Sequence, residues 1–157
     1  MTLPVRPETD RRIDDLLARL PQKGSALLPA LYLIQEEKGW VSEESMEYIA
    51  GKIGLPPAFV SGVVSFYTMF HRQPVGRHHI QVCRTLPCAL RGADRLMAHV
   101  KMRLGIRDGE TRADGRYSLT SVECLGACDR APFLQINDRE YGPVDEAKMD
   151  DILKRLE

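Results

Sequence analysis

The spacing of apolar residues changes near Pro74–Gly76, and this change limits the folds open to the chain. Before it, apolar residues recur every three or four positions, as they do on one face of an α-helix. After it, apolar and polar residues alternate over 80–83, which is typical of a short β-strand. The sequence therefore predicts two regions, a helical one at 1–75 and a mixed one of strands and helices at 76–157.

Four amphipathic helices are expected in the first region. Their apolar positions are, in chain order, Ile13, Leu16, Leu17 and Leu20; Leu27, Leu28, Leu31 and Ile34; Met46, Ile49 and Ile53; and Phe59, Val60, Val63, Val64 and Tyr67. Ser25 and Ser42 are candidate N-caps of the second and third helices, because a short hydroxyl side chain accepts a hydrogen bond from a free N–H group. Gly39 and Gly54 are expected to end these helices, since glycine readily adopts a left-handed cap. Pro56–Pro57 begins the fourth helix, which we expect to continue to the break described above.

The second region is expected to contain a strand, a helix, two strands and a final helix, in this order. The first of these helices has Leu90, Met97, Val100 and Leu104 as its apolar positions and ends at Gly105; the later strands are Tyr117–Val122 and Phe133–Asn137; the final helix carries Met149, Ile152, Leu153 and Leu156. A turn is expected at Asn137-Asp138. Helices of this kind cover a small sheet, so the expected fold class is α+β, preceded by a small N-terminal helical bundle.

Charge and hydropathy exclude two classes of function. The 157 residues include 22 Lys and Arg and 22 Asp and Glu, so the net charge is zero and we expect no nucleic-acid partner. The most apolar stretch, 26–34, contains a proline and is far shorter than the roughly 20 residues that cross a bilayer, so no direct membrane insertion is expected. The start of the sequence lacks the apolar core of a secretory signal, and its acidic residues argue against a transit peptide. We therefore expect a soluble, cytoplasmic protein.

The four cysteines form two pairs, each directly after an expected strand. Four residues separate Cys83 from Cys88, and three separate Cys124 from Cys128. Loops at strand ends can direct several thiols toward one point. Four thiolates complete the ligands of either a [2Fe-2S] cluster or a tetrahedral zinc ion.

The cysteine spacing favours the iron–sulfur interpretation over three alternatives. Structural zinc sites use knuckles with two to four intervening residues, so these pairs are permissible but not typical. A dithiol oxidoreductase needs two residues between its cysteines at the start of a helix, and neither pair has two. Two structural disulfides would suit an exported protein, which the N-terminus does not indicate. A [2Fe-2S] cluster is therefore the favoured interpretation, while zinc, disulfides and unconnected buried thiols stay open.

Several segments of the chain resemble those of a known family in the same order. They are Glu37-Lys-Gly-Trp-Val41, Val64-Ser-Phe-Tyr67, Gln73-Pro-Val-Gly-Arg77, Cys83-Arg-Thr-Leu-Pro-Cys88, Leu90-Arg-Gly-Ala-Asp94, Asp114-Gly-Arg-Tyr-Ser-Leu119 and Glu123-Cys-Leu-Gly-Ala-Cys-Asp-Arg-Ala-Pro132. Over residues 13–156 the chain resembles the thioredoxin-like [2Fe-2S] subunit of NADH:quinone oxidoreductase, which is the E-type subunit of respiratory complex I. The paired cysteine segments are the most specific part of this resemblance.

The resemblance implies a thioredoxin-like [2Fe-2S] ferredoxin domain whose cluster is held by Cys83, Cys88, Cys124 and Cys128. It also implies an electron-transfer role in complex I, with single electrons exchanged with the FMN of a partner subunit that binds NADH. The expected partners are this flavin subunit and other peripheral-arm subunits, at the cytoplasmic side of the inner membrane. One alternative is the equivalent gamma or diaphorase-type subunit of an NAD-dependent formate dehydrogenase or NAD-coupled hydrogenase. A zinc-stabilised structural module is another.

The residues next to the cysteines are candidates for tuning the cluster rather than for catalysis. The sequence has no G-x-G-x-x-G motif, Walker loop or nucleophile–base pair, so we expect NADH and flavin on the partner. Positive charge near a cluster favours its reduced form, which makes Arg84, Arg91 and Arg130 candidates; ordinary solvated surface is the alternative. Gly126 is expected to allow a tight turn between two ligands.

Histidines and aromatic residues form two further groups. The histidines are His71, His78, His79 and His99. Because the cysteines already complete the coordination, we expect these to be surface or strand-end residues rather than ligands. The aromatic residues are Trp40, Phe66, Tyr67 and Phe70. Their helical spacing favours the core, with a docking surface as the alternative.

Overall fold

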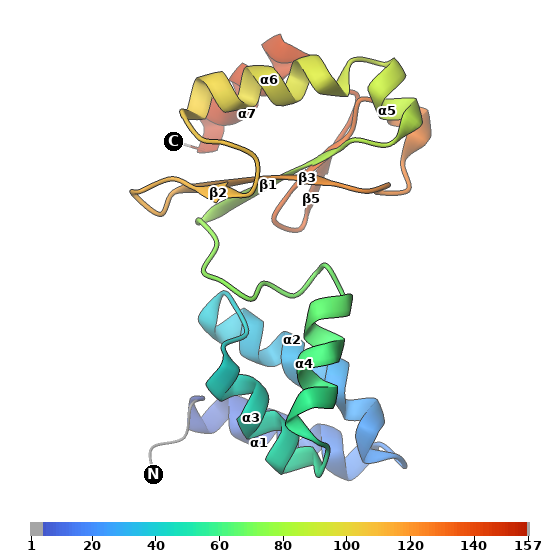
Figure 1. The fold of residues 1–157 in the computed structure, drawn as a ribbon, viewed down its shortest axis with the longest axis vertical. Helices are drawn as coiled ribbons and strands as arrows, with labels where there is room; N and C mark the ends of the chain where they lie inside the picture. The colour runs from blue at the N-terminus through green and yellow to red at the C-terminus, as the bar shows by residue number, and fades with distance from the viewer. Residues whose placement is uncertain (1–4, 157) are drawn as a thin grey trace. The chain divides into compact units, whose positions relative to one another are not determined.

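The computed structural model describes residues 5–156 and divides into two compact units, Met1–Pro74 and Val75–Glu157, each with its own hydrophobic core (Figure 1). We call them the helical unit and the α/β unit. Residues 1–4, at the N-terminus that was tested above for a secretory signal, lie outside the described residues, as does Glu157. Within residues 5–156, no helix is both long enough and apolar enough to cross a membrane.

The helical unit contains α1 (Pro7–Arg19), the 3-10 turn η1 (Lys23–Ala26), α2 (Leu27–Lys38), α3 (Glu43–Ile53) and α4 (Pro57–Phe66). α1 packs on α2, and α3 packs on both α2 and α4. The apolar faces meet in one core, whose fully buried members include Ile13, Leu31, Ile34, Ile49 and Val60. Helices of this length are marginal in isolation, so this shared core stabilises them.

The predicted helix caps have mixed outcomes. Ser42 caps α3 as predicted, because its hydroxyl accepts a hydrogen bond from a backbone N–H of the first turn (3.2 Å). The prediction for Ser25 is wrong, since Ser25 lies inside η1 and Ala26 at the start of α2 already has helical φ and ψ (−79° and −11°). The chain therefore enters α2 from a helical turn, not from the extended conformation of a serine cap. Gly39 and Gly54 end α2 and α3 at φ +80°, as predicted.

The prediction that α4 continues toward residue 74 is wrong. The helix ends at Phe66, and the next residue has an extended backbone with ψ 107°. The segment after α4 instead hydrogen-bonds to residues far away in the sequence. The His71 N–H donates to the Gln35 side chain (2.7 Å), and the Val41 N–H donates to the His71 carbonyl (2.8 Å). These bonds replace helical ones and leave Phe66 76% exposed.

A charged cluster joins α1 to α3. Lys52 Nζ contacts the Asp10 carboxylate and lies 3.0 Å from Asp14 Oδ1, and the Tyr48 hydroxyl donates to Asp10. The side chains of Lys52 and Asp10 are 16% and 21% exposed, so both charges are largely withdrawn from water. Hydrogen bonds from Lys52 and Tyr48 hold the pKa of Asp10 below its ordinary value of 3.8.

We expect Lys52→Met to lower the free energy of unfolding by about 1–2 kcal/mol, because Asp10 and Asp14 keep their charges but lose the ammonium group that pairs with them. Because the pKa of Asp10 is lower in the folded chain, the stabilisation is present above pH 3.8 and is lost as the pH falls through the folded value. Thermal unfolding followed by circular dichroism should show a smaller difference between wild type and variant in acid than at neutral pH. Lys23→Met, in the exposed turn η1, is the control. An equal difference at both pH values would contradict the ion pair.

The α/β unit contains β1 (His78–Cys83), α5 (Leu86–Leu90), α6 (Ala93–Leu104), β2 (Glu110–Thr111), β3 (Tyr117–Val122), the 3-10 turn η2 (Cys128–Arg130), β4 (Leu134–Ile136), β5 (Arg139–Tyr141) and α7 (Glu146–Leu156). The five strands form one sheet in the order β2-β3-β1-β4-β5. β1 and β3 are parallel, and the other neighbouring strands are antiparallel. α6 and α7 lie side by side on one face of this sheet (Figure 1). The predicted α+β class is confirmed.

The helix that was predicted over 90–104 is two helices. Gly92, at φ +100°, separates α5 from α6. Leu90 is consequently 78% exposed instead of lying on a buried face. β2 and β5 were not predicted, because strands of two and three residues are too short to show alternation. The turn predicted at Asn137 is present, with φ 52°.

Candidate metal centre

The four cysteines stand at or after the ends of two neighbouring strands of the sheet. Cys83 is the last residue of β1, whereas Cys124 and Cys128 follow β3. β1 and β3 are parallel, with Cys83 opposite Val122. Because parallel strands end at the same edge of a sheet, both cysteine-bearing segments leave the sheet side by side.

Cys88 lies in the short helix α5 and not in a loop as predicted. Pro87 stands in the first turn of this helix, where its fixed φ favours helical backbone. The helix has only five residues, and Cys88 lies with Cys83 in one buried apolar cluster.

The thiols are organised as two pairs. The sulfurs of Cys124 and Cys128 are 3.9 Å apart, and Cys83 and Cys88 lie together in one buried cluster. Cys128 also interacts electrostatically with both members of the other pair. Two thiolates bound at about 2.3 Å to a tetrahedral metal lie about 3.8 Å apart. Cys124 and Cys128 therefore already have the spacing of two ligands on one ion.

The two pairs differ in exposure. Cys83 and Cys88 are each 2% exposed, whereas Cys124 and Cys128 are exposed. The buried pair belongs to a small apolar cluster that also contains Ala93, Ala127, Ala131 and Phe133. Burial raises the pKa of the Cys88 thiol to about 11, with a smaller contribution from its hydrogen bond to Cys83.

Hydrogen-bond donors point at the sulfurs. The Gly126 N–H donates to Cys124 Sγ (3.3 Å), and Gly126 has a left-handed φ of +79°. Thr85 Oγ1 lies 3.3 Å from Cys83 Sγ. Burial raises the pKa of Cys83, but hydrogen bonds from Thr85 and the Leu125 backbone outweigh burial and hold it below its ordinary value. Since sulfur binds iron as thiolate, four thiols, of which Cys83 and Cys124 have such donors, fit a [2Fe-2S] cluster.

Two of the three candidate arginines are paired with carboxylates. Arg84 Nε donates to Glu123 Oε1 (2.9 Å), and Arg130 Nη2 donates to Glu140 Oε2 (3.0 Å). Arg91 lies exposed between α5 and α6. The paired guanidiniums therefore bring less net positive charge to the site than the sequence alone indicated.

The ion pair between Arg84 and Glu123 was missed by sequence reasoning. Arg84 follows Cys83 and Glu123 precedes Cys124, so the pair connects the two cysteine-bearing segments. The sequence did contain a signal for this ion pair, because residues of opposite charge stand next to cysteines at the ends of two expected strands. Both side chains are mostly exposed, at 63% and 71%, so we assign the pair little stabilising free energy.

The histidines make other contacts. His99 Nε2 lies 2.8 Å from Asp150 Oδ1, and His79 Nε2 lies 3.1 Å from Thr120 Oγ1. Across residues 5–156, no three His, Cys, Asp or Glu side chains are grouped so as to hold a single metal ion. Of the aromatic residues, Phe70 is buried and Phe66 is exposed.

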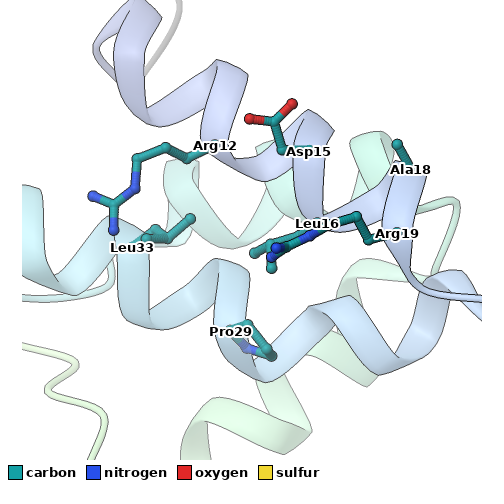
Figure 2. A pocket seen from close by; sticks show the side chains of 7 residues that line it. All are labelled: Arg12, Asp15, Leu16, Ala18, Arg19, Pro29 and Leu33. Atoms are coloured by element: carbon teal, nitrogen blue, oxygen red, sulfur yellow. The ribbon is translucent and has the colours of Figure 1, made fainter.

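A cavity of about 440 Å³ lies between α1 and α2 (Figure 2). It is lined by Arg12, Asp15, Leu16, Ala18, Arg19, Pro29 and Leu33. The Arg12 guanidinium is paired with Glu36 (3.2 Å). Because no cysteine lines this cavity, it is separate from the candidate metal centre.

Comparison with family models matches residues 13–157 to thioredoxin-like [2Fe-2S] ferredoxins. The chain belongs to the thioredoxin-like [2Fe-2S] ferredoxin family. The cofactor and the thioredoxin-like fold that the sequence predicted are thereby confirmed.

Curated proteins that match most of this chain include subunits of NADH-quinone oxidoreductases. The chain is 44% identical over 146 residues to the E-type subunit of NADH-quinone oxidoreductase from Rickettsia bellii, a match that covers 91% of this chain and 87% of the relative. It is 40% identical over 147 residues to NADH-quinone oxidoreductase subunit 2 of Thermus thermophilus, with 92% and 81% covered. The predicted resemblance to the E-type subunit is confirmed.

A solved structure of a different oxidoreductase is also similar to this ferredoxin. An NAD+-reducing [NiFe]-hydrogenase in the H2-reduced state matches with a TM-score of 0.73 and 25% identity. The match covers 83% of this chain and 22% of the hydrogenase chain. The chain therefore spans about a fifth of the length of that protein.

Proposed function

We propose that this chain is the electron-transfer subunit of an NADH:quinone oxidoreductase, with its [2Fe-2S] cluster held by Cys83, Cys88, Cys124 and Cys128. The observation that carries the proposal is that two pairs of cysteines stand at the ends of the parallel strands β1 and β3, one pair with its sulfurs 3.9 Å apart and the other in one buried cluster. A [2Fe-2S] cluster takes two thiolates on each iron, whereas zinc takes all four on one ion. The paired arrangement therefore favours the cluster.

The chain's residues hold the cluster and stabilise negative charge on its sulfur ligands. When bound, the cluster accepts and returns one electron at a time. Cys124 and Cys128 would bind one iron, and Cys83 and Cys88 the other. The Gly126 N–H at Cys124 offsets the negative charge that an added electron brings. Arg91 adds positive charge beside α5, while Arg84 and Arg130 act mainly through their ion pairs.

On this proposal, the chain has no substrate site of its own. It therefore needs a partner that supplies electrons. The partner is an NADH-oxidising subunit that carries FMN, together with other subunits of the peripheral arm, at the cytoplasmic side of the membrane. Relatives named as NADH-quinone oxidoreductase subunits support this assembly. The absence of a dinucleotide or nucleotide-binding motif from the sequence supports the non-catalytic role.

The second candidate is the equivalent subunit of an NAD-coupled hydrogenase or formate dehydrogenase. The similarity to an NAD+-reducing [NiFe]-hydrogenase favours it. The higher identity to complex I subunits favours the first candidate. Affinity purification of the tagged chain from its own cells separates them, because membrane-embedded quinone-reducing subunits copurify only in the first case.

Metal and sulfide analysis of the anaerobically purified chain tests the cluster itself. We expect iron and acid-labile sulfide in equal amounts, two of each per chain, and a low-temperature electron paramagnetic resonance signal after dithionite reduction. Stoichiometric zinc without sulfide or signal, persisting after reconstitution with iron and sulfide, would overturn the electron-transfer function. The chain would then be a zinc-stabilised module.

A further inference from the structure

The two cysteine pairs differ in access to solvent. Cys124 and Cys128 have their sulfurs 3.9 Å apart, and both residues are exposed. Cys83 and Cys88 lie together in one buried cluster, and each is only 2% exposed. A dissolved oxidant therefore reaches the first pair and not the second, because thiol oxidation depends on access.

We propose that Cys124 and Cys128 form a site of reversible oxidative modification in the metal-free chain. A low-molecular-weight disulfide converts these two thiols into an intramolecular disulfide, while Cys83 and Cys88 stay reduced. The exposed pair is therefore oxidised under conditions in which the other two candidate ligands are not.

The backbone around the exposed pair allows the sulfurs to approach. A disulfide needs an S–S distance of about 2.05 Å and Cβ atoms about 3.5–4.5 Å apart, so a 3.9 Å sulfur separation requires only a short movement. Residues 124–127 lie between β3 and the 3-10 turn η2 and belong to neither. Gly126, at φ +79°, folds this segment back on itself. Side-chain rotation and a small loop adjustment therefore close the bond without disturbing the sheet.

The reaction is a balanced thiol–disulfide exchange. One cysteine thiolate attacks the small disulfide, which forms a protein mixed disulfide and releases one small thiol. The second cysteine thiolate attacks the protein sulfur of that bond and releases the second small thiol. Two protein thiols are oxidised, and one small disulfide is reduced to two thiols that take up the protons. No other co-reactant is needed.

The modification controls cluster loading, a consequence that rests on the proposed function. The disulfide ties up both ligands of one iron, so the oxidised chain cannot accept a [2Fe-2S] cluster. Reduction by a dithiol reopens the site. A bound cluster protects Cys124 and Cys128 from oxidation, because their sulfur atoms are then bonded to iron.

Oxidation of the metal-free full chain with oxidised glutathione, under anaerobic conditions, tests the modification. We expect a mass lower by two hydrogens and a peptide map that links Cys124 to Cys128. Cys124→Ser should instead yield glutathione attached to Cys128. A Cys83→Ser, Cys88→Ser double variant should still form the link. Four free thiols after oxidation, a Cys83–Cys88 bond, or a bond between the pairs would overturn the proposal.

Reconstitution separates this proposal from the proposed function. We expect at least a tenfold loss of iron and sulfide uptake by the oxidised chain, and full recovery after dithiothreitol. Full uptake of iron and sulfide by the oxidised chain would contradict the proposal that the disulfide blocks cluster binding. Failure of the reduced chain to load iron would instead count against the proposed function, while the mapped disulfide would stand.

Discussion

Cys124→Ala is expected to abolish the [2Fe-2S] cluster or to change its spectrum radically, because it leaves one iron with a single thiolate. Cys88→Ala should cause the same loss from the buried pair. Iron, acid-labile sulfide and the electron paramagnetic resonance signal of the reduced chain measure the effect. The expected change in iron and sulfide content is nearly complete, larger than any effect expected from the surrounding residues.

The control for both cysteine variants is Leu86→Ala. Leu86 lies between Cys83 and Cys88 but is 70% exposed, so its side chain contributes little to the buried cluster of apolar residues. We expect its iron, sulfide and spectrum to match wild type. A Cys124→Ala chain with unchanged iron, sulfide and spectrum would remove Cys124 from the ligand set. Circular dichroism of each variant separates loss of the cluster from loss of the fold.

Local sequence signals predicted most of the fold because they depend on few residues. The cap at Ser42 and the stop at Gly39 each need only one residue and a turn of helix. The prediction of the fold was wrong where contacts with residues far away in the sequence determine the local structure. α4 ends at Phe66 because Gln35 hydrogen-bonds the segment that follows, and spacing within that segment carries no trace of this contact.

Some residues of the candidate site could also be predicted from the sequence, and others could not. The four cysteines became candidate ligands through their paired spacing, which left zinc and disulfides open, and through the family resemblance, which implies the full ligand set. Thr85, Glu123 and the backbone donors were not found. Their roles depend on the parallel register of β1 and β3, which places Cys83 opposite Val122. Chain pairing of this kind is a tertiary property that a single strand's pattern does not encode.

Gly76→Ala is expected to lower the free energy of unfolding of the α/β unit by about 2–3 kcal/mol, because no space exists for a Cβ atom. That atom would lie 2.6 Å from the Tyr117 carbonyl carbon and 2.9 Å from the Ser118 nitrogen. Backbone atoms of a paired strand cannot swing aside as a side-chain end can. The substitution also displaces the Gly76 N–H from the Ser118 hydroxyl, to which it donates at 2.6 Å.

Thermal or urea denaturation of the metal-free chain measures this effect, with Gly51→Ala as the matched control. An added Cβ at residue 51, inside α3, meets no atom within 4 Å. Alanine is the better helix former by about 1 kcal/mol, so the control should be as stable as wild type or more stable. Gly76 precedes the first pair of β1 and β3, His78 with Tyr117, and Cys83 forms the last pair, with Val122. Gly76→Ala should therefore also reduce cluster loading. Equal stability of the two variants would show that β3 yields at Tyr117, and would contradict the close approach of the two strands.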